Sequence, residues 1–129
     1  MTASTIINLV DALSPNYYSN SQKLGWLATI DGKIYEEVLM THEDAPEDEF
    51  DPSDYAPTGQ GNIPSLTLLV DDPYAEDLYS FYLLSRIAAA NSEISKYDQF
   101  ATMFNTAYTE WTNYYNKKHM PVKKGRWIL

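Results

Sequence analysis

The sequence of 129 residues contains no cysteine and no long apolar run. Without cysteine, the chain cannot form a disulfide scaffold, a thiolate zinc site or a cysteine nucleophile, and it suits a reducing compartment. No apolar stretch approaches the roughly 18 residues of a membrane span, and no basic region opens the chain as in a signal peptide. We therefore expect a single domain of cytosolic origin.

Basic residues are also scarce, because nine Lys and Arg stand against 18 Asp and Glu, for a formal net charge of −9. None lies between Lys33 and Arg86. Nucleic acids and anionic lipids both attract basic surfaces, so neither is favoured as a partner. Tyrosine, by contrast, occurs 11 times. That surplus fits either a small core filled with large rings or a surface that binds partners.

Apolar residues at helical spacing predict a mainly α-helical fold, a small bundle of about four helices with at most one short strand. Residues 1–129 would form one domain, in which residues 41–65 are an acidic loop and residues 117–129 a basic C-terminal tail. The expected helices cover residues 4–13 and 22–40, capped by Ser4 and Ser21. Two more are expected, one from Asp71-Asp72-Pro73 to about Asn91 and one that Ser92 caps and that continues through Tyr115.

The second of these segments is ambiguous. Leu27, Ile30, Ile34 and Val38 recur at helical spacing, whereas Asp31-Gly32 between apolar flanks indicates a β-hairpin. We favour the helix, because the flanking residues extend the helical stripe and do not alternate cleanly.

The last two helices are expected to pack as an antiparallel hairpin. Residues 78–90 are apolar nearly all round, as in a central helix. The next helix carries a seam of apolar residues at steps of three and four: Ile94, Tyr97, Ala101, Phe104, Tyr108, Trp111 and Tyr115. Such a seam packs along a neighbouring helix.

Residues 41–65 are rich in Asp, Glu and Pro, and we expect residues 43–62 to be mobile because few apolar groups offset their ordering entropy. Gly59-Gln60-Gly61 lacks the lysine of a phosphate loop and predicts a turn. Residues 66–70 predict a short strand or an extended segment. The loop could bind a hard cation, but it does not match the calcium-loop pattern, so no metal or other cofactor is expected.

No arrangement of residues indicates catalysis, and we expect a protein that is not an enzyme. His42 and His119 are expected on the solvated surface, and Glu36 and Glu37 point in different directions. Arg86 is expected to pair with Glu93 or Asp31, or to extend outward.

The strongest pattern is an acidic middle and a basic tail with an apolar tip. In a monomer the two could simply pair, and in an assembly the tail of one subunit could reach the acidic surface of the next and close a ring. The candidate partner-binding residues are Lys117, Lys118, Lys123, Lys124, Arg126, Trp127, Ile128 and Leu129 in the tail, and Glu47, Asp48 and Glu49 in the loop. Catalytic, cofactor and metal sites are not expected.

Four stretches resemble head–tail connector (adaptor, or head-completion) proteins of tailed bacteriophages of Gram-positive bacteria. They are Trp26-Leu27-Ala28-Thr29-Ile30-Asp31-Gly32-Lys33-Ile34 after Pro15-Asn16-Tyr17, residues 73–83, Asn91-Ser92-Glu93 with Tyr97, and Phe104-Asn105-Thr106-Ala107-Tyr108 with Trp111. The resemblance implies a small helical bundle and a non-enzymatic virion protein of the neck, assembled in the host cytoplasm. It also implies self-association into a ring, usually twelve-fold, that contacts the portal protein and the next neck or tail protein while DNA only passes through.

An alternative is a small acidic phage inhibitor that mimics DNA and occupies the basic groove of a host defence protein. A mimic needs rigid carboxylates on helices, whereas most of this charge lies in a Pro-rich loop, so the sequence favours the connector.

Overall fold

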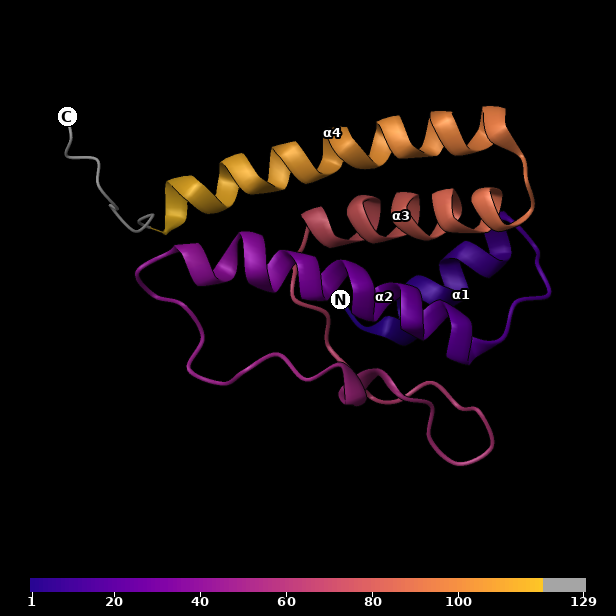
Figure 1. The fold of residues 1–129 in the computed structure, drawn as a ribbon, viewed down its shortest axis with the longest axis horizontal. Helices are drawn as coiled ribbons and strands as arrows, with labels where there is room; N and C mark the ends of the chain where they lie inside the picture. Colours follow the sequence, from indigo (N-terminus) through magenta and orange to yellow (C-terminus); the bar gives the residue numbers. More distant parts are fainter. Residues whose placement is uncertain (120–129) are drawn as a thin grey trace.

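A computed structural model describes residues 1–119 of the chain. It contains four α-helices, α1 (Ala3–Leu13), α2 (Asn20–Glu37), α3 (Tyr74–Ala90) and α4 (Ile94–Lys118), and two short 3-10 helices, η1 (Leu39–Thr41) and η2 (Pro52–Tyr55) (Figure 1). Within residues 1–119 no strand forms, which confirms the prediction of a mainly helical bundle. None of the helices in this part of the chain is long and apolar enough to cross a membrane.

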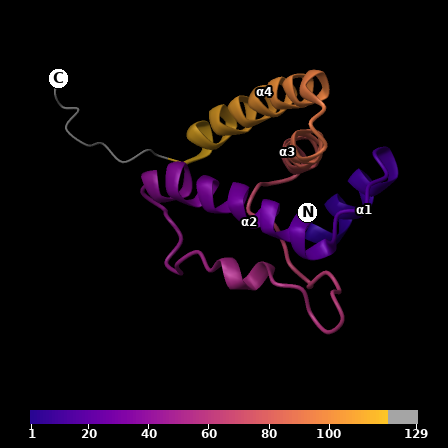
Figure 2. The ribbon, with the colours of Figure 1, turned by 45° about the vertical axis from the view of Figure 1, so that its right-hand side comes forward.

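Helix α3 is the central element, as its all-round apolar sequence predicts. It packs against α1, α2 and α4, and α4 lies antiparallel to it along most of its length. Figure 2 shows α3 and α4 above α1 and α2, with residues 43–65 passing beneath α2. Nine residues of α3 are buried, on several sides of the helix. A helix between two layers must be apolar on more than one face, which explains its composition.

The seam of α4 is confirmed in its C-terminal part and wrong at its start. Trp111 is fully buried, and Phe104 and Tyr115 are nearly so. Ile94 is instead 73% exposed and Tyr97 37% exposed. The difference arises because α4 also contacts the end of α2 only toward its own C-terminus, where the Tyr108 hydroxyl donates to Glu37 over 3.4 Å.

Residues 20–37 form a helix, so the helical interpretation of the second segment is confirmed and the hairpin is not formed. Its first turn also carries a contact that the sequence analysis missed. The Lys23 ammonium group is buried and pairs with Asp11 at 2.7 Å, while the amide of Asn16 donates to the same carboxylate at 3.0 Å. These bonds hold the connection between α1 and α2 in place.

The positions predicted for the helix caps are wrong at all four helices. Thr2 and Ser19 cap α1 and α2, two residues before the predicted Ser4 and Ser21. Helix α3 begins without a side-chain cap, because the Asp71 carbonyl accepts from the backbone N–H groups of Tyr74 and Ala75.

Ser92 does not cap α4, because it belongs to the end of α3. Its φ of 60° is left-handed, the Ser92 N–H donates to the Ala89 carbonyl, and the Glu93 N–H donates to the Ala88 carbonyl. This pair of bonds is the Schellman arrangement that closes a helix C-terminus. One residue cannot complete this turn and also adopt the extended conformation of an N-cap.

Residues 66–70 are extended but do not form the predicted strand. Their backbone partners are only the first residues of the chain: the Ala3 N–H donates to the Leu66 carbonyl, and the Leu68 N–H donates to the Met1 carbonyl, both over 2.9 Å. Because α1 begins at Ala3, the pairing stops at an isolated bridge between Thr2 and Thr67. The turn predicted at Gly59-Gln60-Gly61 is present, with both glycines at positive φ.

Candidate protein-interaction surface

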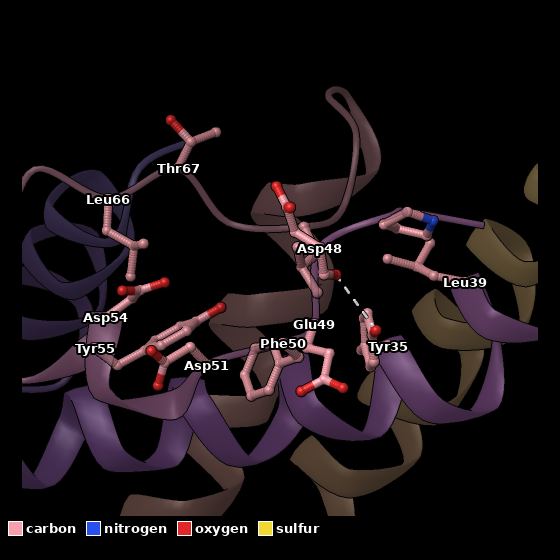
Figure 3. Close-up of a pocket in the computed structure, with 12 residues that line it drawn as sticks. Tyr35, Leu39, Asp48, Glu49, Phe50, Asp51, Asp54, Tyr55, Leu66 and Thr67 are labelled. Carbon is pink, nitrogen blue, oxygen red and sulfur yellow. Dashed lines mark hydrogen bonds between the residues drawn. The ribbon is translucent and has the colours of Figure 1, made fainter. Parts of the chain in front are cut away.

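Two aromatic residues hold the acidic loop against α2. Phe50 packs beside Tyr35 and Tyr55, with ring centroids 5.9 Å and 5.5 Å apart, and Tyr55 is buried (Figure 3). A Cβ atom at Gly32 would lie 3.3 Å from the Phe50 ring, so the absence of a side chain at Gly32 allows this close approach. The glycine that suggested a hairpin therefore serves as the contact point of the loop.

Asp31, next to this glycine, is fully buried and joins four parts of the chain. Its carboxylate accepts from the hydroxyls of Tyr55 and Tyr79 and from the backbone N–H of Leu69, 3.3 Å away. The Tyr79 hydroxyl in turn accepts from the Val70 N–H at 2.9 Å. Burial raises the pKa of Asp31, although the three donors oppose that rise. Burial beside this carboxylate likewise raises the pKa values of Tyr55 and Tyr79.

The contact between Asp31 and Tyr55 means that the loop is not free along its whole length. We therefore expect mobility only in the parts of residues 43–62 that lie before and after η2. Phe50 and Tyr55 are the only Phe, Tyr or Trp residues between His42 and Tyr74. This isolation of two large rings in an acidic segment is the signal from which the anchor could have been found.

A groove lies between the anchored loop and α2. It encloses about 240 Å³, and aromatic and aliphatic side chains make its floor: Tyr35, Leu39, Phe50, Tyr55, Leu66 and Leu69. Asp48, Glu49, Asp51 and Asp54 lie around it (Figure 3). An adjoining hollow of about 560 Å³ shares Tyr35, Pro46, Glu49 and Phe50 with the groove and adds Glu36, Met40 and Glu47.

The charge around this groove and its adjoining hollow is of one sign. No Lys, Arg or His lines either hollow. Hydrogen bonds from Ser53 lower the pKa of Asp51, which therefore stays ionised near neutral pH. Glu47, Asp48 and Glu49, which the sequence analysis selected, are exposed here. The surface thus combines an apolar floor with an anionic rim.

The prediction that both histidines are solvated is wrong for His42, which is buried, whereas His119 is partly exposed. His42 is buried because η1 carries it under α4, where its ring meets Tyr115 edge-on at 4.7 Å. Its Nδ1 group donates to the Val38 carbonyl, and its Nε2 atom pairs with the Asn116 amide at 2.7 Å. His119 is partly buried, stacks on Tyr115 at 3.9 Å and bonds to Asp44, whose pKa this hydrogen bond lowers.

Lys117 and Lys118, in the last turn of α4, are exposed. The Lys118 ammonium lies 5.6 Å from the ring centroid of Tyr114, and Lys117 lines a hollow together with Tyr74 and Tyr114. Neither lysine lines the groove or its adjoining hollow. Lys123, Lys124, Arg126, Trp127, Ile128 and Leu129 lie outside the described residues.

Arg86 extends outward from α3, which confirms one of the two predicted placements. It makes no ion pair within the described residues, because Asp31 is bound to tyrosines and Glu93 pairs with Lys96 at 3.1 Å.

Among residues 1–119, no three His, Asp or Glu side chains are grouped so that they could hold a metal ion. What this surface can offer chemically is an apolar floor and negative charge, which suits binding.

Replacing Tyr55 by phenylalanine is expected to loosen the loop without unfolding the bundle. The lost hydroxyl leaves one bond fewer to Asp31, at a cost of about 1–2 kcal/mol. The amides of Asp54 and Ala56, which donate within η2 over 3.1 Å, should then exchange with solvent about tenfold faster. Hydrogen-exchange mass spectrometry of the loop peptides measures this.

The matched control for this variant is Tyr35→Phe. The Tyr35 hydroxyl donates only to the Asp48 carbonyl at 3.4 Å and is exposed, so its loss should leave exchange in η2 unchanged. Equal exchange in wild type and Tyr55→Phe would show that the hydroxyl does not anchor the loop.

No protein-family model, curated protein or solved structure matches the chain.

Proposed function

We propose that this chain is a structural, non-enzymatic subunit of a tailed-phage particle, an adaptor that forms a ring at the junction of portal and tail. The observation that carries the proposal is an acidic, apolar-floored groove on a small helical bundle, in a chain whose sequence gathers basic residues at its other end. The acidic loop, which borders the groove, passes on the side of α2 away from α3 and α4 (Figure 1). The basic residues begin with Lys117 and Lys118 in the last turn of α4 and continue in the sequence after it. Contacts between unlike surfaces of identical subunits are those that close rings.

The charge also suits a subunit around a DNA passage. A conduit must let DNA slide, and exposed carboxylates repel phosphates instead of holding them. The net charge of −9 and the absence of Lys and Arg from residues 34–85 give the chain such a surface. The resemblance to connector proteins supports the same function.

The inhibitor that mimics DNA remains the second hypothesis, and the placement of the carboxylates disfavours it. The acidic residues of the loop are held at Phe50 and Tyr55, and most of the others on the groove rim belong to no α-helix. A mimic must present its negative charges at fixed spacing, which a segment fixed at two points provides less well than a helix.

Deleting residues 121–129 is expected to leave the bundle folded but to abolish association into rings or with the portal. The four helices end at Lys118, before the deleted residues, and enclose a core of their own apolar side chains. Circular dichroism measures the helices, and sedimentation alone and with the portal ring measures assembly. Substituting Lys123, Lys124 and Arg126 together by glutamine separates the role of charge from that of the apolar tip.

Two results would contradict this model of assembly. Unchanged association of the shortened chain would show that the tail is not the connector. Loss of helical signal would show that the tail belongs to the subunit's own core.

A further inference from the structure

The groove between α2 and the acidic loop has the composition of a receptor for a short peptide. It encloses about 240 Å³ and continues into an open hollow of about 560 Å³ along Met40 and Glu47, so it is an elongated surface and not a closed pocket. A shallow apolar floor with a negatively charged rim suits a peptide that carries a large apolar side chain and positively charged neighbours.

We propose that this groove receives residues 123–129 of a second copy of the same chain. The proposal rests on the proposed function, for which it supplies the receiving site of the head-to-tail contact. Trp127 and Ile128 would lie on the floor formed by Tyr35, Phe50 and Leu66. Lys123, Lys124 and Arg126 would meet the rim.

Charge complementarity selects this segment. Six carboxylates and no Lys, Arg or His line the groove and its adjoining hollow: Glu36, Glu47, Asp48, Glu49, Asp51 and Asp54.

 In the whole sequence, only residues 117–126 gather five Lys and Arg, and large apolar residues follow them directly at 127–129. Opposite charges steer such a segment to the rim, and the apolar side chains bury the floor.

The two described lysines of the basic segment, Lys117 and Lys118, do not line the groove, which favours a second copy over the chain's own tail. The groove opens on the loop side of α2, whereas Lys117 and Lys118 extend from α4 beside Tyr74 and Tyr114. Figures 1 and 2 both show α4 and the loop on opposite sides of α2. A tail that binds the groove of the next subunit joins two unlike surfaces, which is a head-to-tail contact.

Cross-linking of a mixed-isotope sample tests the proposal on the full-length chain. Equal amounts of ¹⁵N-labelled and unlabelled chain are mixed and treated with a carbodiimide, which joins a lysine amine to a carboxylate in contact with it. We expect peptides of mixed isotope that link Lys123 or Lys124 to Glu47, Asp48 or Glu49. Sedimentation velocity on the same sample reports assembly.

Two variants test the floor and the rim separately. Trp127→Ala removes the apolar anchor and should reduce these links about fivefold or more. Glu49→Lys reverses a charge shared by both hollows and should reduce them by a similar factor. Glu43→Lys makes the same charge change in the same loop outside both hollows, so it is the matched control and should leave the links unchanged.

The outcomes separate this proposal from the proposed function. Links of mixed isotope that depend on Trp127 and Glu49 support it. Assembled rings whose links lie elsewhere, or links only within one chain, overturn the groove as the receiving site and leave the adaptor function standing. A chain that neither assembles nor forms links of mixed isotope overturns the docking proposal, and failure to join the portal ring as well overturns the adaptor function.

Discussion

Replacing Trp111 by alanine is expected to lower the free energy of unfolding by about 3–5 kcal/mol, the usual cost of deleting a large buried aromatic side chain. Trp111 is fully buried, and its ring lies 5.3 Å from that of Tyr115 and 6.3 Å from that of Tyr108. No small movement of α4 can fill the space that the indole leaves, because these rings are held by contacts of their own. Chemical denaturation followed by circular dichroism measures the loss.

Two further variants give this prediction its controls. Met103→Ala lies on the same helix but is 38% exposed, so its cost should be well below that of Trp111→Ala. Trp111→Phe keeps a ring in place, and the indole N–H has no partner within the described residues, so it should cost much less than alanine. A loss of less than about 1 kcal/mol for Trp111→Ala would place this side chain outside the core.

Replacing Asp31 by alanine is expected to cost roughly 3–5 kcal/mol, because three donors lose their acceptor in a buried place. These donors are the hydroxyls of Tyr55 and Tyr79 and the N–H of Leu69. The variant should also release the loop and widen the groove, since the carboxylate joins both to α2. Denaturation measures the first effect, and hydrogen exchange of residues 52–56 measures the second.

The control for this substitution is Glu36→Ala. Glu36 is an exposed carboxylate on the same helix, and its loss should change the free energy of unfolding by less than about 0.5 kcal/mol. Similar losses for the two variants would mean that the cost comes from α2 itself and not from the buried carboxylate.

Asp31 also predicts a dependence of stability on pH. Burial raises its pKa in the folded chain above the ordinary value of 3.8, so the folded state binds this proton more tightly than the unfolded state does. The stability that this proton contributes is fully present below pH 3.8 and is lost as the pH rises through the folded pKa.

Asp31→Asn cannot titrate, so the difference in unfolding free energy between wild type and this variant isolates the effect. The difference should fall as the pH rises through this window and stay constant on either side. Asp44 and Asp51, whose pKa values are lowered, act in the opposite direction but are present in both proteins. A difference that does not change with pH would show that burial does not raise the pKa of Asp31.

The sequence predicts the helical hairpin well because its signals are local. The apolar spacing of residues 94–115 and the all-round apolar character of residues 78–90 follow directly from the period of the helix. The exposure of Ile94 and Tyr97 was not predictable in this way. Periodicity indicates which side of a helix is apolar, but it does not tell how far the neighbouring layer extends along that side.

The groove was only half predictable. The acidic residues Glu47, Asp48 and Glu49 stand out in the sequence, whereas their floor comes from segments far apart in the chain, such as Tyr35, Phe50 and Leu66. The role of Asp31-Gly32 shows why. By its local chemistry the pair fits a hairpin turn. In the folded chain it lies within α2, where Asp31 bonds to Tyr55 and Tyr79 and Gly32 lies against Phe50.

The sequence by itself determined the helical class, the order of the long helices, the central position of α3 and the contrast between an acidic middle and a basic tail. All of these depend on composition or on a short period, which a chain carries without regard to its fold. The tertiary structure alone decided which polar residues are buried. Polar residues are expected at the surface from sequence alone. Asp31, Lys23 and His42 are instead buried, because partners distant in the chain supply the hydrogen bonds or the opposite charge that burial requires.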